Sequence, residues 1–138
     1  MPSLDIFHET VGNALDKDGW TITNNPLFLR MGADSFYIDF AAEKMIAAEK
    51  QGRKIAVEVK SFVGVSFATD FHLAVGQYMN YRLLLAEKEA ERALYLAIPL
   101  DIYTSFLKRE FVRKAIQQHG LRLLVFDPQK EEILEWYE

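Results

Sequence analysis

The sequence contains no cysteine among its 138 residues. This excludes a disulfide framework, a zinc site built on thiolates and a cysteine nucleophile. Long apolar runs are also missing, since the longest one, Ala93 to Leu100, is far shorter than the roughly 20 residues that cross a bilayer. The first residues include Asp5 and Glu9, where a signal peptide has a basic start followed by an apolar stretch. These absences predict a soluble cytoplasmic protein.

Proline is scarce, and charge of neither sign dominates. The four prolines, Pro2, Pro26, Pro99 and Pro128, all lie near expected element boundaries. Lys and Arg total 16 and Asp and Glu total 20, for a formal charge of −4, which argues against a generally basic nucleic-acid coat but leaves room for a local basic patch. Half of the residues are apolar and 26% are charged, which predicts one globular domain over residues 1–138.

The first half of the chain predicts one helix followed by strands. Apolar residues recur at helical spacing over residues 3–18, with Ser3 as the expected cap. Short strands are expected at residues 20–23 and 35–40, with a turn at Asn24-Asn25-Pro26 between them. The composition of residues 41–50 favours a helix. The polar segment 49–54 between two apolar stretches instead indicates a hairpin turn, which is the interpretation adopted here.

The second half alternates between helix and strand. The expected elements are a strand over residues 55–62, a helix from a cap at Thr69 or Asp70 to about Ala90, a strand over 93–98, a helix over 102–118 ended by Gly120, a strand over 121–126 and a final antiparallel strand over 133–137. This order predicts a mixed β-sheet flanked by helices, in the α/β (α+β) class.

One group of residues in these strands has the composition of a catalytic site. Glu58 and Lys60 lie two apart in the clearest strand, so they share one face, about 6 to 7 Å apart. Asp39 lies in another apolar strand, and it can meet Glu58 if the two strands are neighbours. Two close carboxylates repel each other, and a divalent cation relieves that repulsion. With the lysine beside them, this pattern suits Mg²⁺-assisted phosphodiester hydrolysis. The alternative is a solvated strand face with a weak ion pair.

The pattern Asp39 followed by Glu58-Val59-Lys60 resembles the D…E-x-K core of the PD-(D/E)xK nuclease-like superfamily. The order of helix, strands, helix and strand also matches that superfamily. The proline that names the motif is missing, because Ile38 precedes Asp39. The resemblance implies a restriction-endonuclease-like fold, with Asp39 and Glu58 as ligands of Mg²⁺ or Mn²⁺ and Lys60 as a catalytic residue.

A second resemblance covers nearly the whole chain and is more specific. The sequence is similar to the XisH family, the cyanobacterial fdxN element excision controlling factors. The stretches that carry the similarity are residues 18–23, 42–50, 55–62, 76–78 and 94–97. The family is associated with programmed excision of a DNA element during heterocyst development, together with a recombinase and a small partner, XisI. The resemblance therefore implies a role in DNA rearrangement.

Other polar residues add weaker candidates for the same site. Gln77 lies on the helix after the Glu58 strand, which often supplies a polar catalytic residue in nuclease-like folds; a surface glutamine is the alternative. Glu9 is a candidate further ligand, although a solvated helical glutamate is the favoured interpretation, and Ser61 is either a phosphate contact or simply the end of the strand. The three histidines lack zinc-ligand spacing.

The best basic patch lies on the expected helix over residues 102–118. The candidates for nucleic-acid binding are Lys108, Arg109, Arg113 and Lys114. Five basic against two acidic residues between Asp101 and Arg122 give that segment a net charge of +3, which leaves −7 on the rest of the chain. Such asymmetry suits one face to a phosphate backbone, and an ordinary solvated helix face is the alternative.

Two functions follow from these observations. The first is a nuclease-like, DNA-binding excision factor that uses Mg²⁺ or Mn²⁺. The second is a catalytically silent interaction module that holds an XisI-like protein or the recombinase. The 10 Phe, 6 Tyr and 2 Trp are many for so small a domain to bury, which predicts contact with a partner or a second copy, with Trp136-Tyr137 as one candidate surface.

Overall fold

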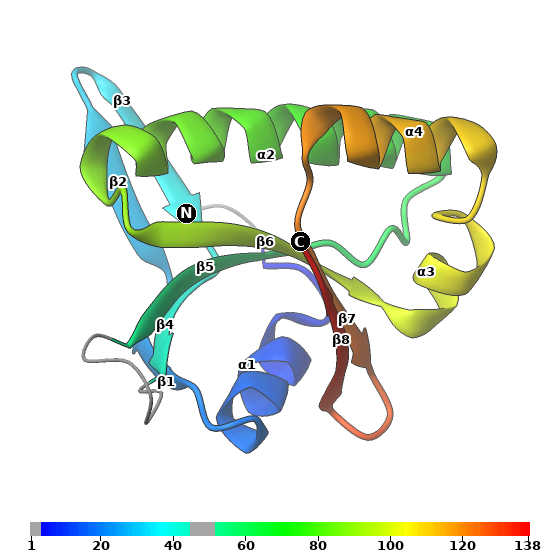
Figure 1. Ribbon diagram of the computed structural model, residues 1–138, viewed down its shortest axis with the longest axis horizontal. Helices are drawn as coiled ribbons and strands as arrows, with labels where there is room; N and C mark the ends of the chain where they lie inside the picture. Colours follow the sequence, from blue (N-terminus) through cyan, green and yellow to red (C-terminus); the bar gives the residue numbers. More distant parts are fainter. Residues whose placement is uncertain (1–3, 45–51) are drawn as a thin grey trace.

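A mixed sheet with helices on both faces forms the body of the chain. The computed structural model describes residues 4–44 and 52–138. Six strands follow one another in the order β1-β4-β5-β6-β7-β8, and Figure 1 shows α2 and α4 over one face of this sheet and α1 over the other. The strands of the sheet are β1 Thr21–Asn24, β4 Phe40–Lys44, β5 Arg53–Val59, β6 Arg92–Pro99, β7 Leu123–Asp127 and β8 Glu132–Tyr137. The predicted mixed α/β architecture is confirmed.

The middle of the sheet is parallel, and its edges are antiparallel. β5 pairs in parallel with β6, and β6 pairs in parallel with β7. Helix α2 (Phe67–Lys88) connects the first pair, and α3 (Leu100–Ser105) with α4 (Glu110–His119) connects the second. β4 and β8 are antiparallel to their inner neighbours. The antiparallel pairing of β4 with β5 confirms the predicted hairpin, although residues 49–51 of its predicted turn lie outside the described residues and residues 53 and 54 belong to β5.

Alternating side chains of β5 pack in two separate hydrophobic cores. Ile55, Val57 and Val59 are at most 1% exposed and pack with residues of α1 (His8–Lys17). Ala56, which points the other way, packs in the core beneath α2. Because β6 and β7 are also buried on both faces, the sheet is the central layer of the molecule. The side of β5 that carries Glu58 is therefore the α2 side.

The strand predicted over residues 35–40 is in fact two strands that meet at Asp39. β3 (Asp34–Ile38) pairs with β2 (Leu27–Met31), in a hairpin apart from the main sheet, whereas β4 begins at Phe40. Ile38 packs in the α2 core and Phe40 in the α1 core. The backbone has to change sheets between them, which places Asp39 at the junction.

Three further predictions of element boundaries are wrong. α1 begins at His8 rather than residue 3, and its expected cap, Ser3, lies outside the described residues. The cap of α2 is Ser66, whose hydroxyl accepts a hydrogen bond from the Thr69 amide at 3.3 Å. The Asp70 carboxylate lies within the first turn and accepts one from the Gly64 amide at 2.9 Å. The helix expected over residues 102–118 breaks between α3 and α4, where buried Leu107 turns into the core.

Other features agree with the sequence. Gly120 ends α4 in the left-handed conformation at φ +63°, where a residue without a Cβ avoids strain. The apolar stripe of α2 is buried at Phe71, Ala74, Tyr78, Tyr81 and Leu85, while Val75 is only partly buried. None of the described helices is long and apolar enough to cross a membrane.

Candidate active site

Glu58 and Lys60 lie at the carboxyl end of β5. Glu58 is 8% exposed, and its Oε2 lies 3.7 Å from the Lys60 Nζ. The Lys60 amide donates to the Ala97 carbonyl at 3.0 Å, so the pairing with β6 continues one residue beyond β5. The shared face predicted for Glu58 and Lys60 is present, and the surface ion pair considered as the alternative is here a largely buried one.

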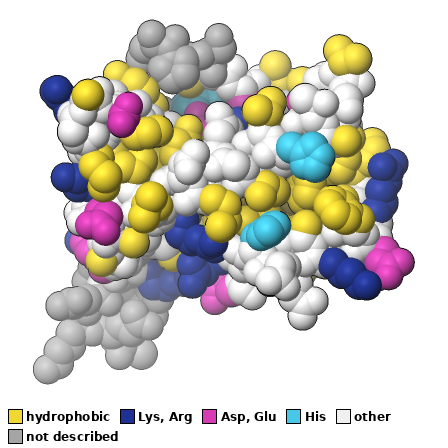
Figure 2. All heavy atoms as spheres, turned by 90° about the horizontal axis from the view of Figure 1, so that it is seen from above, with side chains coloured by type: hydrophobic (Ala, Val, Ile, Leu, Met, Phe, Trp, Pro, Cys, Tyr) yellow, Lys and Arg dark blue, Asp and Glu magenta, His cyan; other side chains and the backbone are white. Residues whose placement is uncertain are grey.

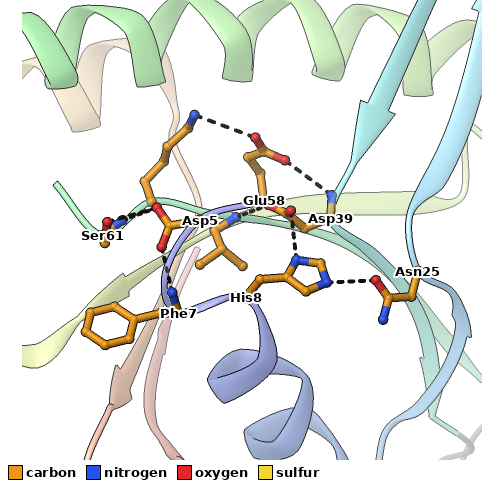
Figure 3. Close-up of polar contacts among 9 residues, drawn as sticks. Asp5, Phe7, His8, Asn25, Asp39, Glu58 and Ser61 are labelled. Atoms are coloured by element: carbon orange, nitrogen blue, oxygen red, sulfur yellow. Dashed lines mark hydrogen bonds and ion pairs between the residues drawn. The ribbon is translucent and has the colours of Figure 1, made fainter. Parts of the chain in front are cut away.

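Asp39 is hydrogen-bonded to Glu58 and to the backbone of Val59, the residue between Glu58 and Lys60. The Asp39 amide donates to Glu58 Oε1 at 3.3 Å, and the Val59 amide donates to Asp39 Oδ2 at 2.7 Å. Figure 3 shows Asp39 and Glu58 side by side at the junction of the hairpin and β5. The sheet change at Asp39, and not a shared strand face, therefore brings the three predicted residues together.

The electrostatics of Glu58 are those of a crowded, buried carboxyl group. Burial and then the neighbouring charge of Asp39 raise its pKa to about 8, against a smaller lowering by Lys60. Tyr81, on the α2 stripe above, has its pKa raised to about 12, chiefly by burial and then by Glu58 and Asp39. Ionising Glu58 therefore places its negative charge beside that of Asp39 in one buried site.

The donor set suits a magnesium-like cation that keeps other ligands. The described residues offer no group of three or more His, Cys, Asp and Glu side chains placed to hold a metal ion. Mg²⁺ needs fewer, because it commonly binds one or two carboxylates and completes its shell with water and phosphate oxygens. Asp39 and Glu58 fit that requirement, and a cation would offset the charge of Asp39 that, after burial, raises the pKa of Glu58.

Three residues that the sequence did not single out complete the polar network. His8, at the start of α1, contacts Asp39 Oδ1 through Nδ1 at 3.0 Å and Asn25 Oδ1 through Nε2 at 2.7 Å. Asp5 accepts hydrogen bonds from the Ser61 amide and hydroxyl, both at 2.9 Å. The spacing of His8 from Val11 and Leu15 puts it on the apolar face of α1, which is a signal of a buried histidine; Asn25 offers no such signal.

The weaker candidates are placed as follows. Gln77 lies one helical turn before Tyr81 on α2, and its Oε1 is a buried atom with no hydrogen-bond partner among residues 4–44 and 52–138. Glu9 is exposed and lines a cavity of about 510 Å³ with His8 and Asn25. The Ser61 hydroxyl donates a hydrogen bond to Asp5. This bond fixes the segment that follows β5. Gln77 is thus the one of these three that has a buried polar atom unpartnered among the described residues, on the same helix as Tyr81.

The four predicted nucleic-acid-binding residues do not form one helical patch. Lys108 and Arg109 lie in the break between α3 and α4, where Lys108 lies over the Tyr103 ring and Arg109 over the Phe106 ring. Lys108 and Arg113 line one cavity of about 530 Å³, whereas Arg109 and Lys114 each line a different one. Lys114 also pairs with Glu110 at 3.1 Å. The break in the helix places Lys108 and Arg109 outside α4, and of the four only Lys108 and Arg113 line the same cavity among the described residues.

The candidate surface at Trp136-Tyr137 is largely used within the chain. Trp136 packs against Trp20 and Tyr95, with ring centroids 5.6 and 4.9 Å apart, and Tyr137 stacks on Tyr103 at 5.0 Å. Both residues are only partly exposed.

Comparison with known proteins decides the family. The model of the XisH protein family matches residues 1–134. The chain belongs to the XisH family. It is 41% identical to an XisH family protein from Nostoc punctiforme PCC 73102, whose crystal structure superposes with a TM-score of 0.89 over 97% of this chain and 100% of the other.

A second XisH relative of known structure carries a functional description. The crystal structure of an fdxN element excision controlling factor protein from Anabaena variabilis is 43% identical, with a TM-score of 0.87 over 98% of this chain and 100% of that one. No match was found among curated proteins. The XisH resemblance drawn from the sequence is confirmed, and the chain is a homologue of an excision controlling factor.

Proposed function

We propose that this XisH family chain is a DNA-binding excision factor of the PD-(D/E)xK nuclease-like type, which hydrolyses a phosphodiester bond with Mg²⁺ or Mn²⁺. The observation that carries the proposal is the convergence of Asp39, Glu58 and Lys60 at the end of β5. The homologue described as an fdxN element excision controlling factor supports DNA as the substrate.

Each residue has a distinct part in this reaction. Asp39 and Glu58 would hold the cation, which supplies charge neutralisation and a more acidic bound water. Lys60, 3.7 Å from Glu58, orients the attacking water and stabilises negative charge that develops on the phosphate. Gln77 adds a polar oxygen from α2. In the hydrolysis, a water oxygen bonds to phosphorus, one P–O ester bond breaks, and the departing oxygen takes up a proton.

The direct test is nicking of supercoiled DNA by the purified chain with Mg²⁺ or Mn²⁺. The parent is expected to convert supercoiled to open-circular DNA, and Asp39→Asn, Glu58→Gln and Lys60→Ala are expected to lose this activity. Glu87→Gln, at an exposed position on α2, is the matched control and should keep it. Equal nicking by the parent and all three site variants would show that a contaminant is responsible and would refute the assignment.

A second function, an interaction module without catalysis, is favoured by the outer face of the helical layer. Figure 2 shows hydrophobic side chains spread across the middle of this face. Leu73 and Leu83 of α2 are each 60% exposed and Phe111 of α4 is 67% exposed. Surfaces of this kind mark contacts with proteins, and the formal charge of −4 favours a protein over DNA. The proposed partners are an XisI-like protein, a recombinase or a second copy of the chain.

Sedimentation velocity distinguishes this alternative from the first function. A complex with an XisI-like protein, weakened by Leu73→Ser and Leu83→Ser but not by Asp39→Asn, is the expected result for an interaction module. A monomer that forms no complex with that protein would count against it.

A further inference from the structure

His8 lies between the two ends of the β2–β3 hairpin. Its Nε2 is 2.7 Å from Oδ1 of Asn25, which lies just before β2, and its Nδ1 is 3.0 Å from Oδ1 of Asp39, which follows β3 (Figure 3). The imidazole also stacks on Phe40, with ring centroids 4.4 Å apart. With 8% of the residue exposed, this side chain is fixed by contacts on its edges and on its face.

The Asp39 carboxylate is consequently held at both of its oxygens. Oδ2 accepts the Val59 amide at 2.7 Å, and Oδ1 lies against the His8 ring nitrogen. Two donors from different elements, one from β5 and one from α1, define the plane of the carboxylate. Each carboxylate oxygen has two lone pairs, so one on each oxygen is left after these contacts.

We propose that His8 is a positioning residue for Asp39. Its Nδ1–H holds the Asp39 carboxylate in a single orientation beside Glu58. Its Nε2 contacts the side-chain oxygen of Asn25 at the base of the hairpin. The effect of His8 on metal binding rests on the proposed metal-dependent function. Loss of a group that orients a metal ligand commonly lowers metal affinity 10- to 100-fold. The orientation of Asp39 itself can be measured without a metal.

Two amide substitutions separate the two ring nitrogens of His8. The side-chain nitrogen of asparagine takes the place of Nδ1, and that of glutamine the place of Nε2. His8→Asn therefore keeps the donor to Asp39 and gives up the contact with Asn25, and His8→Gln does the reverse. Each variant loses one buried hydrogen bond, so both should lower the midpoint of urea unfolding to a similar degree.

Two readouts distinguish positioning from a merely structural role. The first is the dissociation constant for Mn²⁺ alone, followed by water proton relaxation; His8→Asn should stay within about twofold of the parent, and His8→Gln should weaken about tenfold or more. The second is hydrogen exchange at the Val59 amide without metal, which should accelerate in His8→Gln and remain slow in His8→Asn. The corresponding variants of exposed His72 are the controls.

The two readouts also keep this inference apart from the proposed function. A parent that binds no Mn²⁺ would remove the metal-dependent function, and Val59 exchange would then decide the role of His8 alone. Equal exchange rates in His8→Asn and His8→Gln, or faster exchange in His8→Asn, would overturn the inference. Unequal exchange in the expected sense together with Mn²⁺ binding supports both.

Discussion

The Asp39 carboxylate accepts a hydrogen bond from the backbone amide of Val59, the residue between Glu58 and Lys60. This hydrogen bond, 2.7 Å long, links the residue that follows the β2–β3 hairpin to the end of β5. Side chains on either side of Val59 point to the α2 face, while Val59 itself is buried toward α1. The carboxylate thus reaches the backbone between the two members of the E-x-K pair from the end of the hairpin, and not from a neighbouring position on their strand.

We expect Asp39→Ala to destabilise the chain more than Asp39→Asn. Alanine leaves the buried Val59 amide without an acceptor, at a cost of about 1–3 kcal/mol, whereas asparagine retains an oxygen for that amide. Urea unfolding of the two variants measures the difference. Asp34→Asn, at an exposed position at the start of β3, is the control for loss of one negative charge. Equal destabilisation by alanine and asparagine would contradict the role assigned to this hydrogen bond.

The raised pKa of Glu58 predicts that stability falls as pH rises. The group ionises near its ordinary pKa of 4.5 in the unfolded chain but only near 8 in the folded one. Between these values the folded chain holds the additional proton, so the free energy of unfolding decreases with pH, by at most about 1.4 kcal/mol per pH unit. The contribution is complete below pH 4.5 and lost as pH passes through about 8.

Glu58→Gln is the matched variant for this pH dependence. Its neutral amide removes the titrating group, so the variant should gain stability relative to the parent as pH rises from about 5 to 8. Unfolding in urea at a series of pH values measures the difference between the two chains. Parallel stability curves would show that Glu58 does not titrate in this range.

Much of the layered fold could be predicted, because its signals are local. The alternation at Ile55, Val57 and Val59 indicated a strand buried on one side, and the same pattern put Glu58 and Lys60 together on the other. β2 was missed even though buried Leu27 and Leu29 alternate with exposed Phe28 and Arg30. Five residues with only two buried positions give a weak periodic signal.

Asp39, Glu58 and Lys60 were predicted as site residues, but the way in which the fold brings them together was not. The pairing of Asp39 with Glu58 depends on a change of sheet, which is set by Ile38 and Phe40 entering different cores. No pattern of residue spacing in the sequence indicates this change of sheet. His8 and Asn25 come from segments that only the tertiary fold brings to Asp39, and the break at Leu107 depends on where the sheet leaves room for one side chain.

If the chain binds DNA, its basic residues should contribute unequally. Lys108 and Arg113 line the same cavity, so they can contact one phosphate backbone together, whereas Lys114 is already paired with Glu110. Lys108→Ala and Arg113→Ala should each reduce the slope of log affinity against log salt by about 0.9, and Lys114→Ala should change it less. Fluorescence anisotropy of labelled duplex DNA at several salt concentrations measures these slopes. Equal slopes for all variants would exclude this cavity as a DNA contact.

Lys60 should have opposite effects on metal binding and on cleavage. Its ammonium group lies 3.7 Å from Glu58. Its positive charge therefore partly neutralises the two carboxylates and competes with a bound cation. A cation that binds only the folded chain stabilises it, by about 2.7 kcal/mol at a hundredfold excess over its dissociation constant. Mn²⁺ suits the same carboxylate and water ligands as Mg²⁺, so either cation should give this stabilisation.

Thermal unfolding with and without millimolar Mn²⁺ tests this relationship. The parent should be stabilised by the metal, and Asp39→Asn and Glu58→Gln should lose most of that stabilisation. Lys60→Ala should keep or increase it, because the competing charge is gone, yet it should not nick DNA. An unchanged parent, or carboxylate variants stabilised as much as the parent, would refute the metal site. A Lys60→Ala chain with weaker metal stabilisation would show that the ammonium group supports the site instead of competing with the cation.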